Sequence, residues 1–221
     1  MNDAPTAASG WLAPEIEDEL PGLRLLVAEA RHTPRQRLDG GSPPEIEARL
    51  RDLSNRFRGA RAVNLRREPV PAAYRVFFRQ IGLDPDIART PIEAAVMERM
   101  LRGGFLPGRL LEDVLLIALL DTGVPVWALD ARSLDGRLGI RASVEGEPLG
   151  RHPDAGTLAG GRLVVADGAG ALAELFGEPP QGHAAGAASE TLTLFAVQVE
   201  GVPTLYVEEA LWAARAGLER A

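Results

Sequence analysis

The sequence predicts an α+β fold, because helical patterns gather in the N-terminal half of the chain and strand patterns in the C-terminal half. The best-specified stretch, residues 90–142, combines two apolar helices, a buried strand that ends in Asp130, and a hairpin after it. Apolar residues make up 46% of the 221 residues and charged residues 25%, so a sizeable core is expected. We expect one domain over residues 15–221 and a disordered tail at residues 1–14, which are small and polar with two prolines.

A strand over residues 23–28 and four helices account for the N-terminal half. Ser42 is expected to cap the first helix, with prolines in the first turn, where their missing N–H has no helical partner to lose. The second helix follows Pro71. Its spacing points an apolar face inward and directs Arg75 and Arg79 away from the core.

The third helix has the clearest boundaries of the four. Thr90 is placed to cap it, and Glu93, three residues further on, completes a capping box. Ile92, Val96 and Met100 recur every four residues, so we expect one stripe of this helix to face inward.

The fourth helix, at residues 109–121, is apolar nearly all round from Val114 onward and is therefore predicted to be central and buried. Beyond it, short apolar runs separated by turn signals predict mainly strands. The predicted elements are strands at 124–129, 138–142 and 162–166, with the second returning as a hairpin through Asp135-Gly136, a short helix at 169–176, a hairpin over 191–207, and a terminal helix at 208–218.

The composition excludes several classes of protein and site. A net charge of −7 argues against a globally basic nucleic-acid binder. The chain has no cysteine, and its histidines, His32, His152 and His183, fall in predicted loops without metal-ligand spacing, so we expect no metal and no cofactor. The longest apolar run, residues 114–120, is shorter than the roughly 20 residues of a membrane span. The first residues do not resemble a signal peptide, which predicts a cytoplasmic protein.

Charged residues offer two candidate sites. Between residues 56 and 89, eight arginines against three acidic residues give a net charge of +5, which fits phosphate groups but fits an ordinary solvated face equally well. Asp130 ends an apolar strand, where ligand-facing residues often lie, although a turn aspartate that bonds local amides is the simpler interpretation. No nucleophile elbow or phosphate loop is present, so no catalytic residue is assigned.

A series of short motifs runs through most of the chain. It comprises PAAYR at 71–75, IGLDP at 81–85, RTPIEA at 89–94, RGGFLP at 102–107, PV at 125–126, LD at 129–130, LGIRA at 138–142, GE at 146–147 and LG at 149–150. The ordered series resembles the B3/4 domain family, which occurs as the editing domain of the phenylalanyl-tRNA synthetase beta subunit and as free-standing proteins. The resemblance covers roughly residues 20–210.

This resemblance implies a pocket for the ester end of an aminoacyl-tRNA. In the synthetase the domain clears tyrosine mischarged onto phenylalanine tRNA, with water attacking the ester carbonyl. The chain is therefore expected to bind tRNA or aminoacyl-tRNA, and it is a candidate deacylase acting in trans. The residues expected around the pocket are Asp130, Arg141, Glu147 and Asp167, and those expected to contact RNA are Arg75, Arg79, Arg89 and Arg99.

Three positions depart from the family pattern. Leu116 stands where the family has an asparagine, Arg162 stands where it often has a glutamate, and Ala188 stands where a glutamate recognises the substrate. The last departure implies that tyrosine recognition is lost, because an apolar pocket discriminates poorly against a hydroxyl. The alternative function is a non-catalytic module that binds RNA, an amino-acid-like ligand or a protein. For Arg141 and Glu147 the alternative is a surface pair across a turn.

Overall fold

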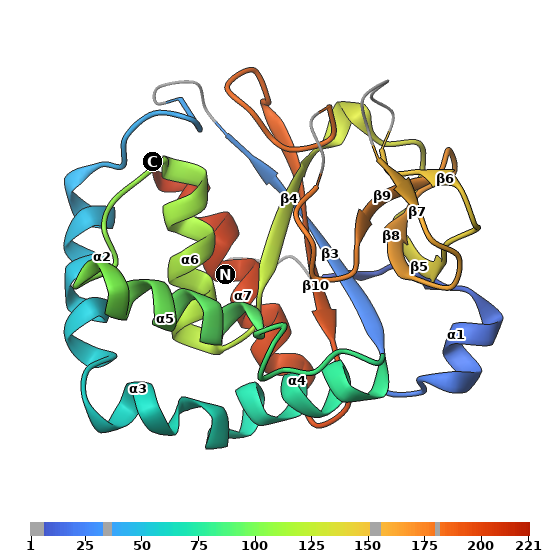
Figure 1. Ribbon diagram of the computed structural model, residues 1–221. Coiled ribbons are helices and arrows are strands. Elements are labelled where there is room, and N and C mark those ends of the chain that lie inside the picture. The colour runs from blue at the N-terminus through green and yellow to red at the C-terminus, as the bar shows by residue number, and fades with distance from the viewer. Residues whose placement is uncertain (1–6, 33–36, 151–155, 180–181) are drawn as a thin grey trace.

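The computed structural model describes residues 7–32, 37–150, 156–179 and 182–221 (Figure 1). Most helices gather on one side of the molecule and the strands on the other, which confirms the α+β class. In chain order the elements are β1 (Ala8–Ser9), β2 (Trp11–Leu12), α1 (Pro14–Glu19), β3 (Arg24–Arg31), α2 (Pro44–Arg56), α3 (Ala60–Asn64), η1 (Leu65–Arg67), α4 (Pro69–Gln80), α5 (Pro91–Arg102), α6 (Leu110–Thr122), β4 (Val126–Asp130), η2 (Ala131–Ser133), β5 (Gly139–Ala142), β6 (Glu147–Pro148), β7 (Thr157–Leu158), β8 (Leu163–Ala166), β9 (Ala171–Glu174), β10 (Thr191–Gln198) and α7 (Thr204–Arg220). The early strand β3 and the terminal helix α7 correspond to the strand predicted at 23–28 and the helix predicted at 208–218, although both are longer than predicted.

Two four-stranded sheets form the β part of the molecule. The first, ordered β1-β3-β10-β4, is antiparallel throughout, and β3 and β10 pair along their whole lengths. The second is ordered β2-β5-β8-β9, with only the β2–β5 pair parallel. Helix α7 packs against β3 and β10, and α6 packs against α7, so the main core lies between the first sheet and these two helices.

Helix α5 begins and ends where the sequence predicts. Thr90 and Glu93 form both arms of the capping box, and the Thr90 hydroxyl also donates to the Glu93 carboxylate at 2.7 Å. Ile92 and Val96 are buried, but Met100 is 53% exposed, so its predicted inward position is wrong. The reason is geometric: a step of four residues turns about 40° past one full helical turn, and two such steps carry Met100 off the inward stripe.

Residues 8–9 and 11–12 form strands, so the predicted disordered tail is wrong for the part of residues 1–14 that the structure describes. Strand β1 pairs with β3 and strand β2 pairs with β5, so this segment bridges the two sheets. The Gly10 N–H donates to the Leu25 carbonyl, and the Trp11 indole N–H donates to the Arg137 carbonyl, each within 3 Å. These hydrogen bonds to distant residues hold the segment in place, although its own sequence contains few signals that favour a strand. Residues 1–6 lie outside the described part of the chain.

Two predicted hairpins and one predicted helix are wrong. Strands β4 and β5 do not form a hairpin, because β4 pairs with β10 and β5 joins the other sheet. Residues 171–174, within the predicted helix at 169–176, are strand β9, which pairs with β8. Residues 204–207 begin helix α7 instead of returning as a strand, because Val207 starts a helical stripe of buried side chains that continues through Ala210, Leu211, Ala214 and Leu218.

Ser42 does not cap α2. Pro43 takes the N-cap position, and the Ser42 hydroxyl donates instead to Asp113 Oδ2 at 2.6 Å. Asp113 is buried on α6 and also accepts the Gly108 N–H. The buried, charged carboxylate is a strong acceptor and orients the Ser42 side chain toward α6, while α2 begins one residue later than the predicted cap requires.

Candidate functional site

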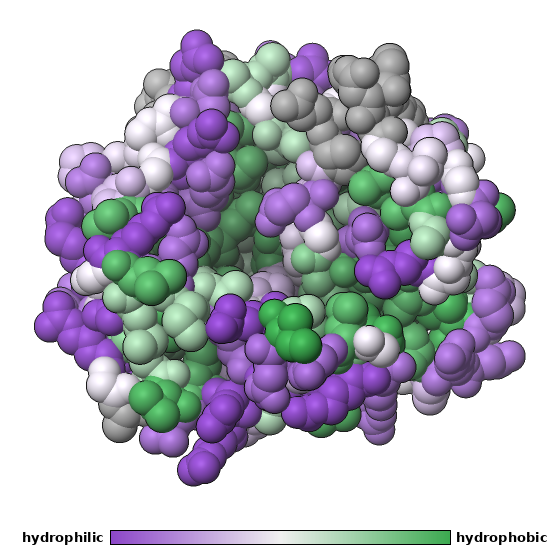
Figure 2. Space-filling model, viewed as in Figure 1, coloured by the Kyte–Doolittle hydropathy of each residue, from purple (hydrophilic) through white to green (hydrophobic). Residues whose placement is uncertain are grey.

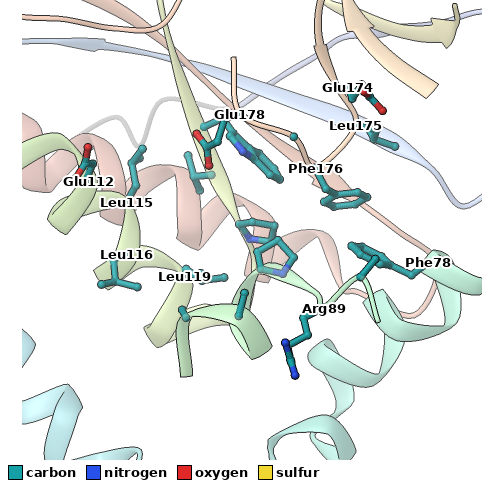
Figure 3. A pocket seen from close by; sticks show the side chains of 18 of the residues that line it. Phe78, Arg89, Glu112, Leu115, Leu116, Leu119, Glu174, Leu175, Phe176 and Glu178 are labelled. Atoms are coloured by element: carbon teal, nitrogen blue, oxygen red, sulfur yellow. The ribbon is translucent and has the colours of Figure 1, made fainter. Parts of the chain in front are cut away.

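A cavity of about 780 Å³ opens between α5 and α6 on one side and β4 and the end of β9 on the other. Figure 2 shows a hydrophobic recess between the helical and strand parts of this face. Leu115, Leu116 and Leu119 of α6 form one wall, and Figure 3 shows them across the cavity from Phe78 and Phe176. These leucines are available because α6 is apolar nearly all round, so one apolar face remains after the other has packed into the core.

The wall opposite α6 is aromatic. The centroid of the Phe176 ring lies 5.1 Å from that of Phe78 and 5.8 Å from that of Trp127. The rings of Tyr74 and Phe77 complete the cluster at 5.8 and 5.9 Å from Phe176. Tilted and edge-on ring pairs at these distances attract one another, so the wall is held in shape and suits an apolar group of a ligand.

Charged side chains stand at the mouth of the cavity. Arg89 is exposed on one side, and Glu112 and Glu178 lie on another (Figure 3). Glu178 is exposed, but partial desolvation, and secondarily the nearby charge of Glu112, raise the pKa of its carboxyl above its ordinary value. Glu174 also lines the cavity and pairs with Arg162 at 3.0 Å. The site therefore combines an apolar interior with one guanidinium and several carboxylates at its entrance.

Asp130 and Asp167 were predicted to surround the pocket, but neither lines this cavity. Asp130 accepts the Arg132 N–H at 3.0 Å and the Ser189 hydroxyl at 2.8 Å. Asp167 is buried and accepts the Asp135 N–H at 2.7 Å. For Asp130 the simpler interpretation, a turn aspartate that bonds local groups, describes the structure, and Asp167 ties two turns together.

Arg141 and Glu147 form a bidentate ion pair that also lies outside the cavity lining. Glu147 additionally accepts the N–H groups of Val144 and Ala171, at 3.0 and 3.2 Å. The hydrogen bonds from Arg141 lower the pKa of Glu147 to about 2 against the effect of burial. The pair thus connects the turn after β5 to the start of β9, and it is more buried than a surface pair across a turn.

This ion pair predicts acid sensitivity. Because the pKa of Glu147 lies below its ordinary value of 4.5, its ionised form stabilises the fold above that pH and the contribution is lost as pH falls toward 2. With a discount for partial exposure, we expect about 2 kcal/mol. Urea unfolding at pH 6 and at pH 3 should show Glu147→Gln losing less stability between the two than wild type. An equal loss in both proteins would contradict the assignment.

The four arginines predicted to contact RNA lie in different environments. Arg75 does not point away from the core: it is 8% exposed and binds Glu93 and Asp86, each at 2.6 Å. Its guanidinium therefore already binds two carboxylates, and the predicted outward direction of its side chain is wrong. Arg99 is half-buried and donates to the Ser54 carbonyl at 2.9 Å. Only Arg79 and Arg89 of the four are exposed.

Arg89 lies where two hollows meet. It lines the large cavity and also a groove of about 340 Å³ that includes Arg66, Arg75 and Asp86. The hydrogen bond from Arg75, and more weakly the charges of Arg79 and Arg66, lower the pKa of Asp86. Arg66, Arg75 and Arg89 thus line this groove together with two carboxylates, Asp86 and Glu93, both of which are paired with Arg75. The unpaired positive charge beside the cavity mouth therefore comes from the exposed arginines and not from Arg75.

The aromatic wall and Glu178 were not identified from the sequence. Aromatic residues are only 5% of the chain, so their convergence is unusual, but it depends on contacts between α4, β4 and the end of β9 that no local pattern encodes. Of the three departures from the family pattern, Leu116 lines the cavity and Arg162 pairs with its lining residue Glu174. The Ala188 carbonyl accepts a hydrogen bond from Arg132.

Two histidines are more enclosed than their predicted loops suggested. His32 and His183 are buried, and His183 Nδ1 lies 3.3 Å from the Ser133 hydroxyl oxygen. His152 lies outside the described residues. Within the described ranges, no group of three histidine, aspartate or glutamate side chains could hold a metal ion, and no helix is long and apolar enough to cross a bilayer.

Part of the chain is similar to the beta subunits of bacterial phenylalanine–tRNA ligases. Over 86 residues, 39% of its length, it is 39% identical to the phenylalanine–tRNA ligase beta subunit of Xanthomonas oryzae pv. oryzae (strain MAFF 311018). It is 38% identical over 86 residues to the beta subunit of Xylella fastidiosa (strain 9a5c). The chain spans 10% of the length of these relatives, and no family model matches it. The similarity is therefore to part of a synthetase beta subunit.

Proposed function

We propose that the chain is a B3/4-like module that binds the aminoacyl end of a tRNA and hydrolyses a mischarged ester in trans. The observation that carries this proposal is the apolar cavity with Arg89 at its mouth, in a chain partly similar to a phenylalanine–tRNA ligase beta subunit. The cavity would hold the amino-acid side chain. Arg79 and Arg89, with Arg66 beside them, would contact phosphates at its entrance.

Hydrolysis in this cavity would use water as the nucleophile. Among the described residues that line it there is no serine, threonine, cysteine or histidine. Water would attack the ester carbonyl carbon, the bond to the ribose oxygen would break, and that oxygen would leave with a proton. Glu178 is the candidate general base, because its carboxyl lines the cavity and its raised pKa makes it a stronger proton acceptor than an ordinary glutamate.

The test measures binding and deacylation of a panel of mischarged tRNAs. We expect Arg89→Ala to weaken binding across the panel and to reduce the slope of log affinity against log salt by about one. The control is Arg51→Ala, an exposed arginine of α2 that does not line the cavity. Glu178→Gln should slow deacylation by about 100-fold while leaving tRNA bound.

The three possible results of this test lead to different functions. Turnover of one mischarged species that depends on Glu178 supports an editing enzyme. Binding without turnover supports the alternative, a non-catalytic module, which the apolar Leu116 in the cavity wall favours. A wild-type protein that neither binds tRNA nor hydrolyses its ester would overturn both.

A further inference from the structure

The turn after β9 holds a phenylalanine in a conformation that suits glycine. Phe176 has φ of +66°, and within the described residues it is the only non-glycine residue with positive φ. It occupies the third position of a turn closed by the Gly177 N–H, which donates to the Glu174 carbonyl at 2.8 Å. A bulky L-residue there is strained, and such strain persists where the surroundings hold the side chain and tends to mark functional positions.

Contacts of the Phe176 ring compensate for the strained backbone conformation of this residue. Its centroid lies within 6 Å of those of Tyr74, Phe77, Phe78 and Trp127. The ring is nonetheless only half-buried, because it also lines the cavity. In Figure 3 it stands above Phe78, on the side of the cavity facing the leucines of α6. The aromatic cluster therefore holds the ring against the space that a ligand would occupy.

We propose that Phe176 is a specificity-determining residue whose ring limits the size of the apolar group that fits between the aromatic wall and α6. The inference rests on the proposed function only for the nature of the ligand, an aminoacyl group. Glycine would remove both the ring and the strain, whereas alanine would remove the ring alone. The two substitutions thus separate cavity size from backbone strain.

The test uses three stable amide analogues of an aminoacyl-tRNA end: 3′-alanylamino-, 3′-leucylamino- and 3′-tryptophylamino-3′-deoxyadenosine. Isothermal titration should show that wild type prefers the leucyl to the tryptophyl analogue. Phe176→Gly and Phe176→Ala should both shift this preference toward the tryptophyl analogue by about tenfold or more. Phe176→Leu, which keeps most of the bulk, should shift it less. The glycine variant should resist urea better than the alanine variant.

A matched control removes a ring outside the cavity. Phe105 packs edge-on against Phe57 in a separate core cluster, so Phe105→Leu should lower stability without moving the size preference. If Phe176→Gly and Phe176→Ala weaken the binding of all three analogues equally, Phe176 is merely structural and the proposal is overturned. If none of the three analogues binds wild type, the proposal is also overturned. The proposed function fails separately, only if mischarged tRNA is neither bound nor hydrolysed.

Discussion

Replacing Arg75 with alanine is expected to destabilise the fold by about 3 kcal/mol, because it leaves the largely buried Glu93 carboxylate without its cationic partner. Arg75 extends from α4 and joins Glu93 of α5 to Asp86 of the intervening loop, with both distances 2.6 Å. The Glu93 side chain is only 14% exposed, so water would not replace the lost guanidinium well. Urea unfolding of wild type and Arg75→Ala measures the difference.

Two further variants test the cause of this loss. Arg79→Ala removes an exposed arginine one turn along the same helix and should change stability by less than about 0.5 kcal/mol. Arg75→Met combined with Glu93→Gln removes both charges while keeping most of the volume, and should recover much of the stability. If Arg75→Ala cost no more than Arg79→Ala, the ion pairs would contribute little and the role assigned to Arg75 would be wrong.

The Arg75 pairs also position the cavity mouth. They fasten the loop between α4 and α5, and this loop supplies Leu83, Ala88 and Arg89 to the cavity lining. Arg89 itself is exposed, so its orientation depends on the loop that carries it. Arg75 thus contributes to the proposed site indirectly, through Asp86 and Glu93, although it was predicted to contact RNA directly.

Local signals predicted the helices better than the sheets. The capping box of Thr90 and Glu93 lies within one helical turn, so the sequence alone contains both partners. Strand pairing instead depends on residues far apart in the chain, as when β10 lies between β3 and β4. The run Leu138–Ala142 therefore predicts a strand correctly but not its partner, and the hairpin was wrong for that reason.

The candidate site was less predictable than the fold for a related physical reason. A periodic pattern shows which side of a helix is apolar. It does not show whether a charged side chain is buried because it pairs with a residue far away in the chain. The spacing of α4 placed Arg75 outside, yet two carboxylates from the next loop and helix make its burial favourable. The aromatic wall likewise depends on Phe78, Trp127 and Phe176, which are separated by about 50 residues each in the chain and meet only in the tertiary structure.

Gly139→Ala is expected to cost about 3 kcal/mol through a direct clash with the indole of Trp11. A Cβ at position 139 would lie 2.0 Å from Trp11 Cδ2 and 2.2 Å from Cε2, far inside any real contact. Gly139 does not have positive φ, so the cost is steric and not conformational. The substitution should displace the N-terminal segment from the second sheet, where β2 pairs with β5.

A double-mutant cycle isolates this contact. Trp11→Ala should itself destabilise the fold, because the indole covers Gly139 and donates to the Arg137 carbonyl at 2.9 Å. In the Trp11→Ala background, however, Gly139→Ala should be nearly neutral, or slightly stabilising, because alanine loses less backbone entropy than glycine on folding. Unfolding free energies of the four proteins give the coupling. If Gly139→Ala costs the same in both backgrounds, the close approach of Trp11 does not explain why position 139 requires glycine.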